Sequence, residues 1–201
     1  MCIRDSSQNC AKRDAGSASG PAPTDFSSEV MTSIIAARQI LSNAANKTNP
    51  ALTEAENTKL QEHVKMASVA WEKCIAATAV HYVNDLFADM DEYTLGKPAT
   101  LSNFETVAKH WSELKGFVMS LQFSPASPFR DAAVTTVDLD DLKHINMLVG
   151  DAPVLADGSQ MGVAPSGTAE DAIYAYRGKL LEVRATLQSA YGFSDANTVA
   201  W

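Results

Sequence analysis

The sequence predicts an all-α protein, and three observations carry this prediction. Hydrophobic residues recur at steps of three and four through several long segments, which is the period of an amphipathic helix. Clusters rich in Pro, Gly and Asn separate these segments. The strongest candidate for a strand is the short run AAVTTVDL, residues 132–139, so no sheet of useful size is expected. At 201 residues the chain is long enough to bury a core.

The first two predicted helices are separated by the segment NAANKTNP. One begins near Ser27 and carries an apolar stripe, and it ends before Pro50. The next begins at Thr53, because Thr53 and Glu56 have the spacing of a capping box. Its helical pattern runs to about Tyr93, an unusual length, so we expect a kink or break within it.

Three further helices are predicted toward the C-terminus. One runs from Ser102, which is followed by a Glu at the third position after it, to about Leu121. The prolines of residues 122–137 predict a loop. The stretch 138–150 opens with acidic residues and closes at a Gly, which is typical of a short helix. The last helix spans residues 168–191.

The N-terminal segment differs in composition from the rest. The opening MCIRDS resembles a leader that derives from sequencing adapter, and the following stretch is rich in Ser, Ala, Gly and Pro. We therefore expect residues 1–26 to be a flexible or non-native leader, and residues 27–201 to be a helical-bundle domain truncated at both ends. No signal peptide is recognisable in this fragment.

Cysteine content and charge restrict the function. Cys2, Cys10 and Cys74 show neither a CxxC spacing nor a zinc pattern, so we expect no disulfide framework, and we interpret Cys74 as a small buried hydrophobic residue. The formal net charge of −8 argues against nucleic acid as a partner. No apolar run approaches the ~18 residues that span a bilayer.

The stretch AKHWSELKGF, residues 108–117, contains the first candidate metal ligands. With 100° per residue, His110 lies at the edge of the apolar stripe of its helix, and Glu113 flanks it on the polar side. Imidazole and carboxylate at this spacing are neighbours that could share one cation or one hydrogen bond. The alternative is a structural histidine at the edge of a bundle.

A second candidate group lies on the preceding helix. His81 and Asp85 share a side with Asn84 and with several small residues, and small residues at helical spacing favour close helix packing. A buried polar group must be hydrogen-bonded or bound to a ligand. His81 and Asp85 therefore either complete a metal site with His110 or form a hydrogen-bonded network that specifies the fold.

Four segments together resemble an uncharacterised domain family of bacterial envelope lipoproteins related to imelysin, the family of insulin-cleaving membrane proteases. They are AATAVHYVND, AKHWSELKGFVMSLQFSP, HINMLVGDAPVL and AYGFSDANT. The resemblance implies an imelysin-like helical bundle, here a fragment of a larger two-bundle protein. It also implies a periplasmic or cell-surface lipoprotein whose lipid anchor is absent from this fragment. The metal motif Gly-x-His-x-x-Glu of that family falls on His110 and Glu113, with Ala108 in place of the glycine.

These observations lead to three functional hypotheses. The first is an envelope protein for binding or uptake of iron, zinc or another metal, with His110, Glu113, His81 and Asp85 as ligands; it requires His81 to lie within a few Å of His110. The second is an envelope module that binds a protein or glycan without metal, which requires an exposed cleft, for example near residues 122–130. A metallopeptidase ranks third, because neither a GxSxG nor an HExxH motif is present. We lean against enzymatic activity.

Overall fold

A computed structural model describes residues 3–94, 101–124, 126–134 and 136–201, and side chains are described from residue 7 and outside 93–102. These ranges contain seven helices and no strand, with one isolated bridge between Gln160 and Val163. The prediction of an all-α fold is confirmed. The helices are α1 (Ile3–Ser17), α2 (Phe26–Ala45), α3 (Glu54–Thr94), α4 (Leu101–Ser120), α5 (Leu139–Val149), α6 (Ala169–Tyr191) and α7 (Asp195–Ala200).

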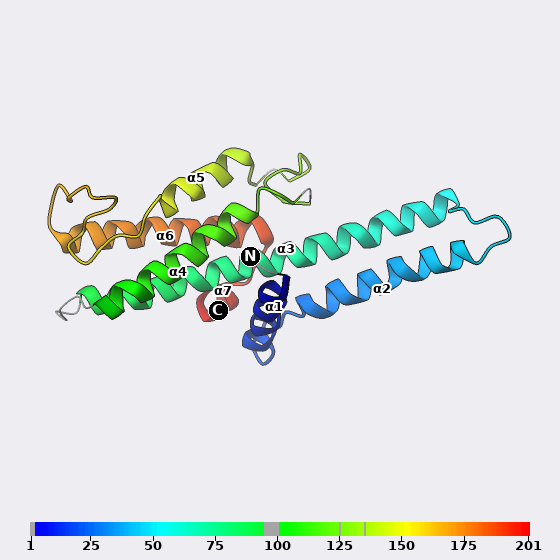
Figure 1. The fold of residues 1–201 in the computed structure, drawn as a ribbon, viewed down its shortest axis with the longest axis horizontal. Coiled ribbons are helices and arrows are strands. Elements are labelled where there is room, and N and C mark those ends of the chain that lie inside the picture. The colour runs from blue at the N-terminus through cyan, green and yellow to red at the C-terminus, as the bar shows by residue number, and fades with distance from the viewer. Residues whose placement is uncertain (1–2, 95–100, 125, 135) are drawn as a thin grey trace.

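Helix α3 is the axis of the molecule. Its C-terminal half packs against α4 and α6, α5 covers α6 and α4, and the short helices α1 and α7 lie against α3 (Figure 1). The N-terminal half of α3 forms an antiparallel hairpin with α2 that projects away from the other helices (Figure 1). The molecule thus consists of a helical bundle and a protruding two-helix hairpin.

The predicted starts of the helices follow from their capping residues. At the start of α3 the Thr53 backbone N–H donates to Glu56 at 2.8 Å, and the Glu56 N–H donates to the Thr53 hydroxyl at 3.2 Å. Hydrogen bonds from Lys47 and Thr53 lower the pKa of Glu56 to about 2. Reciprocal capping boxes also begin α5 at Asp138 and α6 at Thr168. The side chain of Ser102, the predicted cap of α4, lies outside the described residues.

Three features of the helices differ from the predictions, and one of them is α7, a short helix that was not predicted. Helix α3 continues without a break for 41 residues, because no Gly or Pro interrupts residues 54–94. The predicted break is therefore not found. Residues 3–17, within the predicted flexible leader, instead form α1, in which Cys10 and Arg13 are buried. The non-native origin of MCIRDS stays a prediction.

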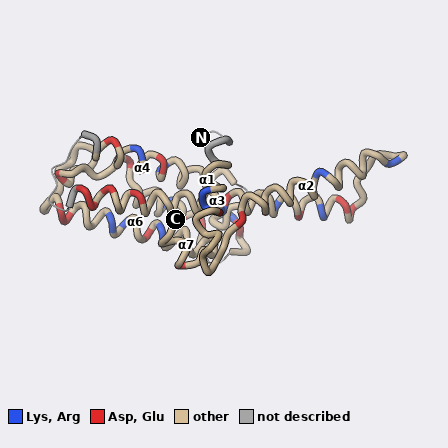
Figure 2. The backbone as a smooth tube through the Cα atoms, turned by 90° about the horizontal axis from the view of Figure 1, so that it is seen from below, with Lys and Arg blue, Asp and Glu red and all other residues tan. Residues whose placement is uncertain are grey.

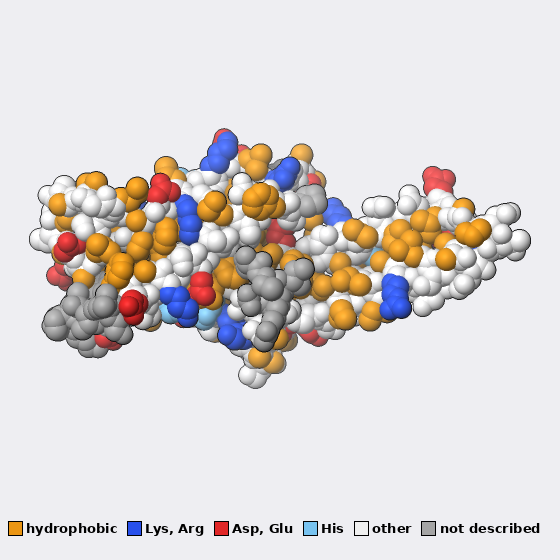
Figure 3. Space-filling view, in the orientation of Figure 1, with side chains coloured by type: hydrophobic (Ala, Val, Ile, Leu, Met, Phe, Trp, Pro, Cys, Tyr) orange, Lys and Arg blue, Asp and Glu red, His pale blue; other side chains and the backbone are white. Residues whose placement is uncertain are grey.

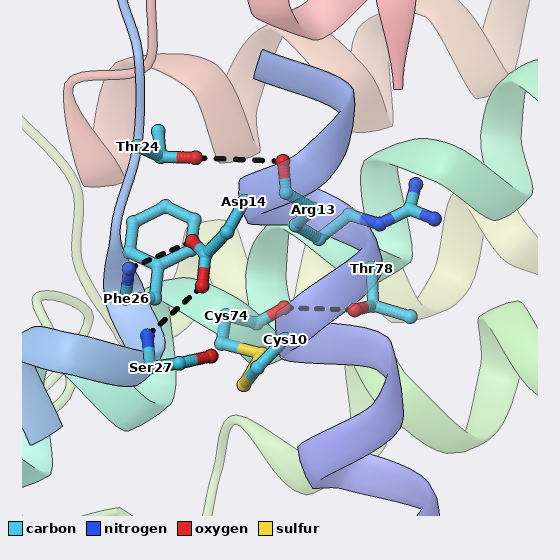
Figure 4. The surroundings of a disulfide bond; sticks show 8 residues. All are labelled: Cys10, Arg13, Asp14, Thr24, Phe26, Ser27, Cys74 and Thr78. Carbon is cyan, nitrogen blue, oxygen red and sulfur yellow. Dashed lines mark hydrogen bonds between the residues drawn. A yellow bond between two sulfur atoms is a disulfide. The ribbon is translucent and has the colours of Figure 1, made fainter. Parts of the chain in front are cut away.

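A disulfide attaches α1 to α3, contrary to the expectation of none. Cys10 and Cys74 are bonded across 64 residues, with Cα atoms 5.2 Å apart (Figure 4). Next to it, Asp14 accepts hydrogen bonds from the backbone N–H groups of Phe26 and Ser27 at the start of α2. Cys74 is buried as predicted, but the fold brings it to a partner that sequence spacing could not identify.

The core of the bundle lies between α3, α4 and α6. On α3 it extends from Cys74 to Met90 and consists mostly of small and branched side chains, which let the neighbouring helices approach closely. Trp111 and Tyr176 both donate hydrogen bonds to the carbonyl oxygen of Val149, at 3.1 and 2.9 Å, and so join α4 and α6 to the end of α5. Within the described residues, no helix combines the length and the apolar character needed to cross a membrane.

Candidate functional site

The candidate site lies where α4 crosses the C-terminal half of α3. His81, Asp85 and Asp89 follow each other at four-residue spacing on α3, so their side chains share one face of that helix. His110 reaches this face from the middle of α4. Two helices that the core holds together therefore bring a row of polar side chains next to one histidine.

The two histidines meet at one carboxylate. The Nε2 atom of His81 lies 3.2 Å from Oδ2 of Asp85, and Nε2 of His110 lies 3.7 Å from the same oxygen. On the other side of its ring, Nδ1 of His110 lies 2.7 Å from Oδ2 of Asp89. All four side chains are partly buried, with exposed fractions between 14% and 32%.

Glu113 belongs to the same region but points to a different group. It forms a hydrogen bond with the hydroxyl of Tyr82. The Tyr82 ring is close to both histidines, with ring centroids 5.0 Å from His81 and 5.9 Å from His110. The Oε2 atom of Glu113 is buried and has no hydrogen-bond partner. Burial and the charge of Glu113 together raise the pKa of Tyr82 to about 12.

The surroundings favour the neutral form of His81. Burial lowers the pKa of His81, and the positive charge of Arg13 lowers it further, whereas Asp85 and the backbone carbonyl of Trp201 oppose this shift. A neutral imidazole keeps a lone pair that a metal ion or a proton can use. Burial raises the pKa of Asp89, and the hydrogen bond with His110 opposes this effect.

Arg13 is the unexpected member of this environment. It projects from α1, is 6% exposed, and interacts electrostatically with Asp85 and Tyr82. Burial is the largest influence on its pKa, which is lowered. Because α1 is attached to α3 through Cys10, the disulfide and the bundle hold this guanidinium near the carboxylate.

Residues near the C-terminus hold Asn84, which lies beside the cluster on α3. The Asn84 amide donates to the carbonyl oxygens of Thr198 and Trp201 at 3.0 and 2.7 Å, and Arg184 donates to the Asn84 side-chain oxygen at 2.7 Å. The sequence indicated that Asn84 lies on the same side of α3 as His81, and these bonds show which groups its side chain contacts there. Asn84 is thus occupied in joining α3, α6 and α7.

The four predicted site residues are thus brought into one region, with differences in their pairing. His81, Asp85 and His110 converge, while Glu113 is directed to Tyr82. Sequence reasoning missed Asp89, although its four-residue spacing from Asp85 was a usable signal. It also missed Arg13, for which no signal existed, because nothing in the sequence placed residues 3–17 against α3.

His144 lies apart from this cluster. Its Nε2 atom is 2.7 Å from Oε1 of Glu182, and both side chains are largely exposed. This pair joins α5 to α6 at the surface and resembles the inner histidine–carboxylate contacts only in its chemistry.

Chemically, the cluster offers two imidazoles and three carboxylates, a donor set that suits Fe, Zn or Mn. Among the described residues, no three His, Cys, Asp or Glu side chains already surround a point where a metal ion could sit. In the arrangement seen, the Asp85 carboxylate itself lies between the two imidazoles. The region can therefore act as a hydrogen-bonded network. If Asp85 rotated out from between the two imidazoles, the Nε2 atoms of His81 and His110 could face a shared cation.

The fold and this cluster define the chain as a helical-bundle protein with a partly buried histidine–carboxylate cluster. None of the protein-family models, curated proteins or solved structures with which the chain was compared matches it.

Proposed function

We propose that this chain is an imelysin-like helical domain of an exported bacterial lipoprotein, and that it binds a transition-metal ion between α3 and α4 for metal uptake. The ligands are His81, Asp85 and His110, with Glu113 available as a fourth. The observation that carries the proposal is the convergence of two Nε2 atoms on one carboxylate oxygen, at 3.2 and 3.7 Å.

These separations suit ligands of one ion. Nitrogen and oxygen ligands bind zinc tetrahedrally at about 2.0–2.2 Å, which places neighbouring ligand atoms ~3.3–3.6 Å apart. Two imidazoles and one carboxylate are also the ligand set of many non-haem iron sites. To reach such an arrangement, Asp85 would have to rotate out from between the two imidazoles, because among the described residues no three ligands surround a common point.

Two further contacts support a metal at this position. The Asp89 carboxylate holds Nδ1 of His110, and this type of second contact orients metal-binding histidines in many proteins. The buried Oε2 atom of Glu113 has no hydrogen-bond partner, so this oxygen remains available to a cation that comes within its reach. Arg13 acts against the proposal, because its charge repels a cation, so we expect moderate affinity.

The disulfide supports an extracytoplasmic location. Structural disulfides persist in the periplasm and at cell surfaces and are rare in the cytosol of most organisms. A bridge between Cys10 and Cys74 therefore agrees with export, which the resemblance to envelope lipoproteins implied.

Metal titration by calorimetry of the full chain tests the proposal, with Fe(II), Zn(II) and Mn(II) added separately. We expect one ion per chain, and loss of binding in a folded His110→Ala/Glu113→Ala variant. The matched control is His144→Ala/Glu182→Ala, which removes the exposed histidine–carboxylate pair and should leave binding unchanged. Absence of binding to folded wild-type protein would contradict the proposal.

A second candidate, an envelope module for a protein or glycan partner, is favoured by the surface beside residues 122–130. Phe123 is 75% exposed there, and Met119 is exposed next to it. Between α4 and α5, a groove of about 530 Å³ is lined by Met119, Leu142, Asn146 and neighbouring residues. This second candidate function would be supported if metals fail to bind and if Phe123→Ala weakens association with envelope components.

A further inference from the structure

The α2–α3 hairpin lacks a hydrophobic core of its own. None of residues 54–69 on α3 is buried, and the buried residues of α2 are concentrated near its ends, apart from Ser33. Helices in water owe most of their stability to the packing of an apolar face rather than to helix propensity. Two helices of about 20 residues, each ~30 Å long, therefore need further packing partners to bury their side chains.

Large hydrophobic side chains are exposed on both helices of the hairpin. They gather over α2 and the N-terminal half of α3 in the space-filling view (Figure 3). The exposed residues are Met31, Ile34, Ile35, Leu41, Val64 and Met66, each exposed by 47% to 59%. They do not all share one side, because Met66 lines a groove on the side opposite to Ile34, Leu41 and Val64. Exposed apolar side chains that share one side of a helix pair can form an interaction site.

The two long sides of the hairpin differ in charge. One side has a groove of about 700 Å³ that is lined by apolar residues such as Met66 and Val69 and by charged residues such as Glu29, Glu62 and Lys73. At 100° per residue, the opposite side carries Ile34 and Leu41 from α2 and Val64 from α3. Arg38 is the charged residue nearest to the middle of that side. A depletion of charge is characteristic of the centre of an interface, so the Ile34 side is the better docking surface.

Charge indicates what covers this surface. Between residues 26 and 73 the acidic residues (Glu29, Glu54, Glu56, Glu62, Glu72) equal the basic residues (Arg38, Lys47, Lys59, Lys65, Lys73) in number. The formal charge of −8 therefore resides entirely in the rest of the chain. Figure 2 shows blue and red positions mixed along the hairpin. Two copies that meet through their bundles would repel each other, whereas two hairpins would not.

From these observations we infer that the Ile34 side of the α2–α3 hairpin is a self-association surface, on which the hairpin of a second copy docks. Two antiparallel helices from each copy complete a four-helix bundle, in which each copy supplies the apolar layer that the other lacks. A two-fold axis makes the same patch serve both copies, so no second complementary surface is needed.

Sedimentation equilibrium of the full chain tests this inference. We expect a mass near twice 21.5 kDa, with a dissociation constant of about 10 μM or tighter. The Ile34→Glu/Val64→Glu variant places charges on the patch and should sediment as a monomer with unchanged helical circular dichroism. Leu181→Glu on α6 is the control, because Leu181 is similarly exposed at 43% but lies on the bundle. It should remain dimeric.

Lysine cross-linking between isotopically distinct copies locates the contact independently. We expect links between copies that involve Lys59 or Lys65 on the hairpin, and none that join Lys143 of one bundle to Lys143 of the other. A wild-type chain that is monomeric at ~100 μM would overturn the inference. So would a dimer that persists in the double variant, or links between copies confined to the bundles.

Discussion

Oδ2 of Asp89 lies 2.7 Å from Nδ1 of His110, and this contact determines which ring nitrogen of His110 is free for other groups. A carboxylate that accepts from Nδ1–H leaves Nε2 as the atom with the lone pair. Nε2 is the atom turned toward Asp85, at 3.7 Å. Asp89 therefore orients the His110 ring so that its Nε2 atom faces Asp85 and any cation bound there.

Asp89→Asn tests this positioning role. The amide keeps the size of the side chain but removes the charge that orients His110, so we expect metal affinity to fall about 10- to 100-fold. Calorimetric titration with Zn(II) measures the change. Glu182→Gln is the matched control, because Glu182 contacts His144 at the same 2.7 Å distance outside the cluster. Equal affinity of wild type and Asp89→Asn would show that Asp89 has no part in a metal site.

Arg13→Gln should strengthen metal binding. Arg13 places a positive charge close enough to Asp85 for each to affect the other, and this charge opposes an incoming cation. Removing it should raise affinity for Zn(II) about tenfold, since even screened charges within a protein contribute on this scale. Arg13→Lys keeps the charge and should leave affinity close to that of the wild type. A weaker binding in Arg13→Gln than in Arg13→Lys would refute this electrostatic account.

The pH dependence of stability should report the burial of His81. Its pKa in the folded state is lowered from about 6.5, so the folded protein binds fewer protons than the unfolded chain below that pH. The stability contribution of neutral His81 is therefore complete above pH ~6.5 and is lost as pH falls toward the folded pKa. Urea unfolding between about pH 5 and pH 8 should show a shallower decline for His81→Gln than for wild type. Parallel curves would show that His81 does not titrate differently on folding.

The fold was largely predictable because its signals are local. Caps such as Thr53, Asp138 and Thr168 and the helix-breaking prolines act within a few residues, so they fixed the start and end of most helices. The apolar stripe of the segment 102–121 was predicted as Val107, Trp111, Leu114, Val118 and Leu121; four of these are buried, and Trp111 is partly buried against the core. The long α3 was recognised in extent, but its continuity was not, because helix length alone does not produce a kink.

The remainder depended on contacts between distant residues. The bond between Cys10 and Cys74, and the approach of Arg13 to Asp85, follow from the packing of α1 on α3, which no periodicity encodes. The pairing of Glu113 with Tyr82 depends on the crossing of α3 and α4. Spacing identified which residues share a face of one helix, but tertiary packing decided which partner each of them meets.

Loss of the disulfide should destabilise the bundle while preserving its helices. The bridge closes a loop with a sequence separation of 64, and disulfides of this kind typically contribute about 2–4 kcal/mol. We expect Cys10→Ser/Cys74→Ser to lower the free energy of unfolding by this amount in urea. Tyr191 and Glu72 should stay paired, because their hydrogen bond lies between α3 and α6 and does not involve α1. Unchanged stability would show that α1 is not held to α3 in solution.

Two adjacent leucines on α6 separate the contribution of the core from that of the surface. Leu180 is completely buried between α6 and its neighbours, whereas Leu181 is 43% exposed. Leu180→Ala leaves a cavity and should cost about 2–5 kcal/mol, while Leu181→Ala should change stability by less than ~1 kcal/mol. Both substitutions have the same effect on helix propensity, so their difference reports burial alone. Urea denaturation of both variants measures it, and similar losses would mean that α6 is packed differently from the arrangement described, with Leu181 also facing the core.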